Sequence, residues 1–581
     1  MKNIKNTFFV LLLAAQYIQA QGIGYPLSNE KVYHAMDRLE ILYGNPAFFY
    51  SSQKTFTRGD ATRYAQYLDT TTSISLSKLD KNDIQYIFDD NNDWLVQSEV
   101  PTTLAGKKEP VVGQLQSPQY RQNTKPFLKH LYKTPANFWE FDTKNFSLRF
   151  NPILNIKAAQ DKNDEELVFT NLRGIEVRGS IDDRVYFYTN ILEQQVRLPN
   201  YGTDWVQKHQ AVPGAGFYKP YQSLIFNIKN GYDFLNAQGL VGFNATKHIG
   251  IQFGHGNNFI GDGMRSLFLS DFSNNYFFLK LNTRVWKFQY QNIFAELAAE
   301  NHTNADNLLP KKFMAAHLLS YNITPNLNFG IFESVILSRK QQFEAQYLNP
   351  IIFYRSVEHA LGSPDNVLVG TNGKWNIIKK CQIYGQVLLD EFIFKELFVN
   401  NKGSWTNKFG VQLGIKYPNA FGIDHLDLQL EYNKVRPFTY SHSDSTNNYS
   451  HAFQPLAHPL GANFKEILFH ARYQPLSRFV FEGRIMSATQ GESDAKNNWG
   501  DVITVPYTTR NSDYGYFTGE GIKAKILLLS FDASFQFYHN MYFDLHALAR
   551  KKDSDDPKLN QRTLYFGGGL RMNIGNSPLL F

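Results

Sequence analysis

From about residue 146 onward, the sequence consists largely of segments in which apolar and polar residues alternate. In IEVRGSI, which begins at Ile175, apolar residues hold the first, third and seventh positions, and charged or hydroxyl residues lie between them. Segments beginning at Leu426 (LDLQLEYN) and Phe531 (FDASFQFY) repeat the pattern. Because successive side chains of a β-strand point to opposite faces, each segment is predicted to be a strand with one apolar and one polar face.

The connections between these strands are predicted to alternate between tight turns and longer polar loops. The tight turns are placed at Asp182–Asp183, Thr246–His248, Thr283–Arg284, Thr324–Asn326, Lys379–Lys380, Pro418–Gly422, Pro475–Ser477 and His539–Asn540. This layout gives about 18 antiparallel strands, an even number within the range of bacterial outer-membrane barrels. The sequence therefore predicts an all-β transmembrane fold, with short turns in the periplasm and long loops outside the cell.

Composition and the first residues favour this class. The chain is 15% aromatic and its mean hydropathy is −0.38, as expected where lipid-facing apolar residues alternate with polar residues facing a lumen. Lys2 and Lys5 precede an apolar run and then Ala20, which predicts a secretory signal peptide over residues 1–20. No later stretch approaches the roughly 20 apolar residues that a membrane-spanning helix requires.

Residues 21–145 are predicted to form a small helical domain followed by a linker. Three amphipathic segments occur there, and their limits are marked by a terminating glycine or a capping side chain at Gly44, Thr57 and Asp80. The barrel then occupies residues 146–581. Because both ends of an even-stranded barrel lie in the periplasm, the helical domain is expected to sit under the barrel or plug its lower mouth.

One long loop combines glycines with groups able to bind an anion or a sugar. The sequence GHGNNFIGDGMRS (Gly254–Ser266) follows the predicted fifth strand, but its glycine spacing does not match the dinucleotide fingerprint and no helix follows it. It is either a bend tied to the wall or a lumenal anion or sugar contact. We expect Arg265 to pair with Asp262 or Asp271 and fold the loop over the lumen. The candidate contacts here are His255, Asn257, Asn258, Asp262, Arg265 and Asp271.

We find no pattern that predicts catalysis or a cofactor. The single cysteine, Cys381, excludes an internal disulfide and a multi-cysteine metal site. The run DDNNDW has calcium-loop spacing, but Trp94 stands where glycine is needed, so we interpret it as a helix end. The net charge of +7 is too small for a nucleic-acid-binding protein. We expect no enzyme activity, no metal, no cofactor and no nucleic-acid partner.

Several motifs resemble a known family. They are GHGNNFIGDGMRSLFLSDFS, YLNPIIFYRSVE, LEYNKVRPFTYSH and HPLGANFKE, with AMDRLEILYG and TFTRGDATRYAQYLD near the N-terminus. Together they resemble the Wzi-like capsule assembly proteins of Bacteroidota, a group that includes the gliding-motility RemB proteins. The resemblance implies an 18-stranded outer-membrane barrel with a helical element at its periplasmic end and long loops folded over its outer mouth.

The same motifs add further candidate loop or lumen contacts, namely Tyr347, Asn349, Arg355, Glu431, Asn433 and Arg436. Two functions follow from the resemblance. The first is assembly or attachment of surface polysaccharide, with glycan bound by the outer loops. The second is a structural role in a gliding-motility or type IX protein secretion machine, in which the barrel docks other outer-membrane or secretion proteins. In both, outer-membrane lipid surrounds the barrel.

Overall fold

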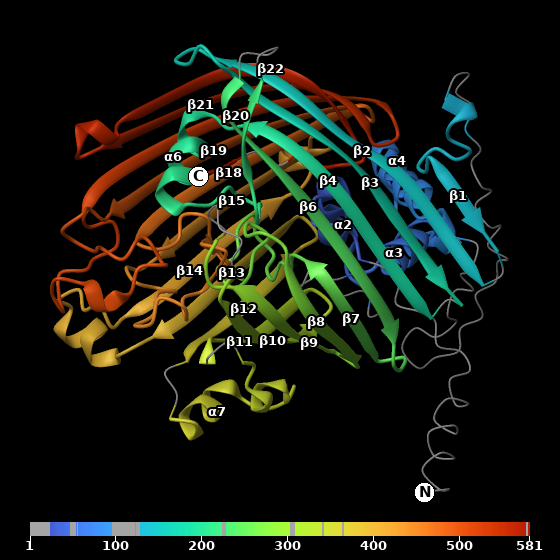
Figure 1. The fold of residues 1–581 in the computed structure, drawn as a ribbon. Helices are drawn as coiled ribbons and strands as arrows, with labels where there is room; N and C mark the ends of the chain where they lie inside the picture. The colour runs from blue at the N-terminus through green and yellow to red at the C-terminus, as the bar shows by residue number, and fades with distance from the viewer. Residues whose placement is uncertain are drawn as a thin grey trace, which may run out of the picture.

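The alternating segments pair edge to edge into one closed antiparallel wall (Figure 1). In this computed structural model, 18 strands form the wall, and the first and last of them, β2 (Phe146–Asp161) and β22 (Gln561–Met572), pair and close it. The predicted fold class is therefore confirmed. The structure describes residues 24–46, 51, 54, 56–95, 123, 128–143, 145–182, 184–223, 228–301, 308–339, 342–362, 365–576 and 579–581.

The wall strands follow one another around the barrel in chain order. Between β2 and β22 they are β3 (Leu167–Ile181), β4 (Val185–Arg197), β6 (Ile228–Asn244), β7 (Ile249–Gly256), β8 (Tyr276–Val285), β9 (Phe288–Ala298), β10 (Lys311–Thr324), β11 (Leu327–Leu337), β12 (Asn366–Ile377), β13 (Cys381–Glu391), β14 (Lys408–Tyr417), β15 (Leu426–Val435), β18 (Phe464–Leu476), β19 (Phe479–Glu492), β20 (Ile522–Tyr538) and β21 (Met541–Ser554).

Four short strands lie outside this series. β1 (Trp139–Asp142) pairs with the start of β2, and β5 (Lys219–Ser223) pairs with the start of β6. β16 (Ser450–His451) and β17 (Gln454–Pro455) form a small hairpin within a long loop.

Tight turns and long loops alternate as predicted, so the two ends of the barrel differ. Most of the predicted turns fall between the expected strands, but two are displaced. The turn predicted at Thr283–Arg284 lies at Trp286 and Lys287, and the turn predicted at Pro475–Ser477 lies at Ser477 and Arg478. Arg284 is still part of β8 and points into the lumen. Its guanidinium lies there 2.9 Å from a carboxylate oxygen of Asp60.

The two faces of the wall divide as the alternation predicts. On β20, the side chain of Phe531 is 50% exposed on the outer face, whereas Asp532 is buried. Gln536 faces the lumen and accepts a 2.9 Å hydrogen bond from Lys31. The outward residues of β20 form an apolar run. Phe535 lies close to the tight turn that ends β20, whereas Phe531 lies nearer to the centre of this run.

The three predicted N-terminal helices are present, and two of the three predicted capping residues are confirmed. They are α2 (Glu30–Tyr43), α3 (Arg58–Thr70), α4 (Lys78–Asp90) and the single turn α5 (Asn92–Leu95). Gly44 ends α2, and Thr57 caps α3 in a reciprocal capping box. The prediction for α4 was wrong by three residues, because Ser77 is the cap and Asp80 is its capping-box partner. No described helix is long and apolar enough to span a membrane.

These helices, which we call the plug (residues 24–95), lie inside the barrel at the end with the tight turns (Figure 1). Arg38 donates a 2.8 Å hydrogen bond to Asn419 in one turn, and Tyr86 donates to Asn540 in another. Their buried face forms a small apolar core of its own. The predicted signal peptide and most of the predicted linker lie outside the described residues.

A second interior segment follows the last strand. Beyond Met572 the chain turns into the lumen and passes the plug, where Gly575 lies against the backbone of Ser28. Phe581 is buried among Tyr201, Trp205 and Phe272, with ring centroids 5.7 to 6.1 Å away. The lumen therefore contains two segments, one that precedes the barrel strands in the sequence and one that follows them.

Candidate functional site

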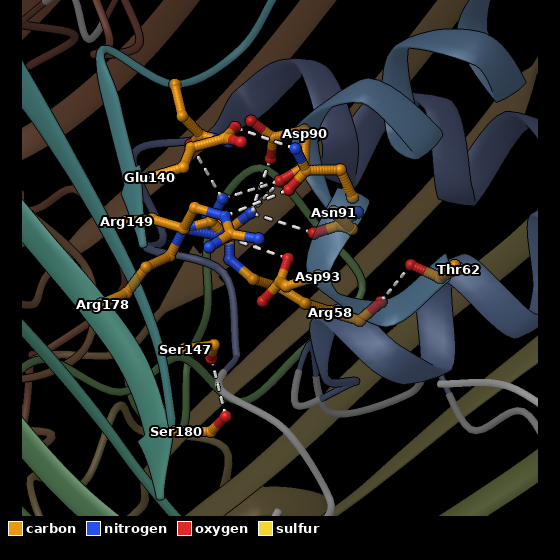
Figure 2. A network of polar contacts seen from close by, with 12 residues as sticks. Arg58, Thr62, Asp90, Asn91, Asp93, Glu140, Ser147, Arg149, Arg178 and Ser180 are labelled. Atoms are coloured by element: carbon orange, nitrogen blue, oxygen red, sulfur yellow. Dashed lines mark hydrogen bonds and ion pairs between the residues drawn. The ribbon is translucent and has the colours of Figure 1, made fainter. Parts of the chain in front are cut away.

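Arginines of the barrel wall fix the plug at its C-terminal turn (Figure 2). Arg178 of β3 donates to the backbone oxygen of Asp90 at 2.8 Å, and Arg149 of β2 donates to Asn92 at 3.1 Å. Within the plug, Arg58 lies 2.6 Å from the Asp90 carboxylate. The predicted helix end at DDNNDW is confirmed, and its carboxylate neutralises buried arginine.

Acid is expected to loosen the plug. Burial raises the pKa of Asp90, but the charge of Arg58 more than offsets this and leaves the pKa below its ordinary value. The pKa of Asp60 is likewise held low by Arg284 and that of Asp37 by Lys416, in both cases against burial.

Carboxyls with a depressed folded-state pKa stabilise the fold above their unfolded pKa of about 3.9, and this contribution is lost as the pH falls toward the folded value. We expect the urea midpoint of the folded protein to hold steady from pH 7 to about 5 and to fall steeply below about 4. Asp37→Asn should lower the midpoint at pH 7 and weaken its dependence on acid. A midpoint that is flat down to pH 2 would contradict this account.

The glycine-rich loop folds into the lumen, as predicted, but its charged residues find other partners. Arg265 pairs with Glu466 of β18 at 3.1 Å and does not pair with Asp262 or Asp271. Glu431 of β15 accepts the backbone N–H groups of Met264 and Arg265 at 2.8 and 3.1 Å. The prediction missed these partners because they lie on strands far away in the sequence.

Lys374 of β12 joins the loop to the plug. Its ammonium nitrogen lies 3.1 Å from a carboxylate oxygen of Glu40 in α2 and 3.6 Å from one of Asp262 in the loop. All three side chains are buried. Ser51, in the segment between α2 and α3, also contacts both Lys374 and Glu40. One wall cation thus holds the plug and the folded loop together.

The mouth at the long-loop end of the barrel is covered by loops that pack into an apolar core. Leu267 and Phe268 of the glycine-rich loop are fully buried beside Leu456 of the β15–β18 loop. Tyr440 donates a 2.8 Å hydrogen bond to the Leu267 carbonyl, and the N–H of Ser270 donates to the Leu456 carbonyl at 2.8 Å. These contacts form a roof over the lumen.

A cavity of about 420 Å³ remains between the plug and the roof. Charged side chains of both plug and wall line it, among them Lys31, Asp37, Arg472 and Glu482. Burial lowers the pKa of Lys31 to about 8. Among the described segments, the plug lies on one side of this cavity and the folded loop on the other, and the cavity is partly open.

Several predicted contact residues have structural roles in the loops. Asn257 donates to the backbone oxygens of Asp271 and Ser273, and Asn258 accepts from Lys280 at 3.0 Å. Asn433 bridges Glu431 and Glu466. Arg436 donates to the carbonyls of Ser404 and Tyr516 and so ties two outer loops together.

Four candidates lie away from the lumen. His255 is still part of β7 and shares its outward face with the exposed Phe253, so it does not point inward as proposed. Tyr347, Asn349 and Arg355 belong to the β11–β12 loop, which packs on the outside of the wall. Loop length alone does not indicate on which side of a wall a loop will fold.

An aromatic and amide-rich surface on the long loops was missed by the sequence reasoning. We call it the outer cluster; it consists of Trp405, Asn497, Tyr507, Arg510, Asn511 and Tyr514. The rings of Trp405 and Tyr507 lie 4.8 Å apart, and the Arg510 guanidinium lies 3.8 Å from the Trp405 ring centre. The side chain of Tyr514 is 46% exposed. The signal was the density of Asn, Tyr and Trp in NNWGDVITVPYTTRNSDYGYF.

Among the described residues, no group of three or more His, Cys, Asp or Glu side chains is arranged to hold a metal ion. The outer cluster is partly exposed. Its accessible face offers flat rings and amide groups, which suit ligands with both apolar and hydroxyl surfaces.

The chain matches no protein-family model and no curated protein. Among solved structures it is similar to Wzi, described as an outer-membrane protein involved in group 1 capsule assembly in Escherichia coli and a carbohydrate-binding β-barrel. The TM-score is 0.55 at 12% identity, over 96% of this chain and 99% of Wzi. Pseudomonas aeruginosa OprD gives a TM-score of 0.39 at 11% identity, over 73% of this chain and 94% of OprD. The likeness to Wzi shows a common fold, that of an outer-membrane β-barrel.

Proposed function

We propose that this protein is an outer-membrane platform that binds surface polysaccharide during its assembly or attachment. The observation that carries the proposal is the filling of the lumen from both ends, by the plug and by the roof, beneath an exposed aromatic and amide-rich surface. A transport channel needs a continuous path, whereas here both the plug and the roof pack inside the barrel and narrow such a path. The Escherichia coli barrel of the same fold is itself described as carbohydrate-binding.

The proposed orientation follows from the two ends of the barrel. The tight turns and the plug face the periplasm, and the long loops, with the outer cluster, face the cell exterior. Tyr514 and Trp405 then meet material outside the cell. Apolar sugar faces stack on such rings, and the Asn511 amide, which donates to Asn497 at 2.6 Å, holds together the loop beside them.

The test is binding of surface polysaccharide, extracted from the source bacterium, to the full-length protein in lipid nanodiscs. Trp405→Ala and Tyr514→Ala are each expected to raise the Kd at least tenfold, a loss of about 1.4 kcal/mol. Trp286→Ala is the matched control, because Trp286 is an exposed tryptophan at the tight-turn end, and it should leave the Kd unchanged.

Absence of binding by the wild-type protein would overturn the glycan proposal. Co-purification of the same protein with other outer-membrane proteins would then favour the docking role in a motility or secretion machine. Equal losses at Trp405 and Trp286 would mean that binding does not involve the outer cluster.

A further inference from the structure

The outer face of the wall carries a polar patch where a membrane barrel should be apolar. Glu333 of β11 alternates in register with Phe329 and Ile331, which are exposed on the outer face. Across the sheet, His317 of β10 lies directly opposite Glu333, and Asn292 of β9 lies opposite His317. The His317 ring nitrogen is 3.1 Å from the Glu333 carboxylate.

This patch lies near the middle of the apolar belt. On β20, the outward residues above the tight turn are apolar from Phe537 to Leu527, and Lys525 follows. Phe531 is the fourth outward residue from its turn, near the centre of that run. Glu333 is likewise the fourth outward residue from the turn that begins β11. A bare carboxylate at that depth would cost several kcal/mol in contact with hydrocarbon.

The β11–β12 loop covers the patch. We call its segment from Glu344 to Leu361 the flap; it contains the short helix α7 (Tyr354–Ala360). Glu333 accepts the backbone N–H groups of Tyr354 and Arg355 at 2.7 and 2.8 Å and is only 1% exposed. Asn292 donates to the Pro350 carbonyl at 2.9 Å. The polar groups of the patch are therefore matched by backbone groups of the flap.

Between Leu348 and Phe353 the opposite surface of the flap is largely apolar, whereas Arg355 and His359 of α7 are exposed and polar. Ile351 is 84% exposed, and Leu348 and Phe353 are about half exposed, whereas Tyr347 and Tyr354 are buried against the wall. In Figure 1, α7 lies outside the barrel, beside the wall and not over its mouth. Irregular backbone is tolerated at membrane depth when it is packed on protein with its polar groups satisfied. That condition holds for the Pro350, Tyr354 and Arg355 backbone groups.

We propose that the Leu348–Phe353 part of the flap is embedded in the outer half of the membrane, where Ile351, Leu348 and Phe353 contact lipid acyl chains and replace the wall of β9–β11 as the lipid-facing surface. The inference rests on the proposed membrane placement of the barrel. The apolar surface of the flap continues onto the wall. Ile331, nearer the tight turn of β11, and Leu389 on β13 are both exposed and apolar. The flap thus binds lipid, and it does not belong to the glycan-binding surface.

The test places a nitroxide spin label at single cysteines in a Cys381→Ser background, with the full chain in phospholipid vesicles. The variants are Ile351→Cys and Phe353→Cys on the flap, Leu430→Cys on the exposed wall, and Lys496→Cys on an outer loop. Collision with oxygen, which concentrates in lipid, is compared with collision with a water-soluble nickel chelate. We expect both flap labels to match Leu430→Cys and to differ from Lys496→Cys.

Flap labels that match Lys496→Cys, while Leu430→Cys reports lipid, would overturn the flap proposal and leave the barrel placement intact. A wall label that reports water would instead refute the membrane placement. Because Ile351 is largely exposed, its replacement leaves the packing of the fold unchanged, and Phe353→Cys provides an independent second reading.

Discussion

Lys374→Met is expected to lower the free energy of unfolding by about 3 to 5 kcal/mol, the cost typical of removing one partner from a buried ion pair. The loss is large because Glu40 and Asp262 would both remain buried without their shared cation. Methionine keeps most of the volume of the side chain, so the effect reports charge and not a cavity. Urea titration of the refolded protein in lipid vesicles gives the value.

Lys380→Met is the matched control. Lys380 is exposed in the turn between β12 and β13, on the same hairpin, and its replacement should change stability by less than about 0.5 kcal/mol. We also expect Lys374→Met to show ionic conductance in planar bilayers, since the plug and the folded loop lose their common anchor. Equal stability of the two variants would show that Lys374 does not hold these elements together.

Phe531→Arg is expected to cost about 2 to 4 kcal/mol, because it places a charge on the lipid-facing side at the centre of the apolar run. Phe535→Arg should cost clearly less, about 0 to 1 kcal/mol, because Phe535 lies nearer the tight turn and the interface. Both residues lie on the outer face of one strand, so only depth differs. Unfolding titrations in vesicles measure the two costs, and equal values would contradict the assigned depth.

The sequence predicts the wall well because its signals are local. Alternation and turn residues lie within a few positions of one another, and they place the 18 strands and the order of turns and loops. Errors arose where a polar residue had a distant partner. The turn predicted at Thr283–Arg284 is displaced, and Arg284 instead faces Asp60 of the plug.

The candidate site was less predictable, because contacts between loops and wall depend on three-dimensional register. The inward fold of the glycine-rich loop was predicted from its glycines, but its partners Glu431 and Glu466 were not. The flap residues were predicted as loop or lumen contacts, although Tyr347 packs on the outer wall. The outer cluster was overlooked because its residues come from two loops about one hundred positions apart. Binding roles for all of these residues stay predictions.

The two interior segments are attached to the two strands that close the wall. The plug leads into β2, and the segment ending in Phe581 leaves β22, so both join the barrel at the same seam. A wall that is still open along this seam can receive both segments sideways, without threading either through a finished ring. Closing the seam and filling the interior then become one assembly step. Moving the chain break to another hairpin by circular permutation would separate these two events, and the barrel would have to close around segments tethered elsewhere.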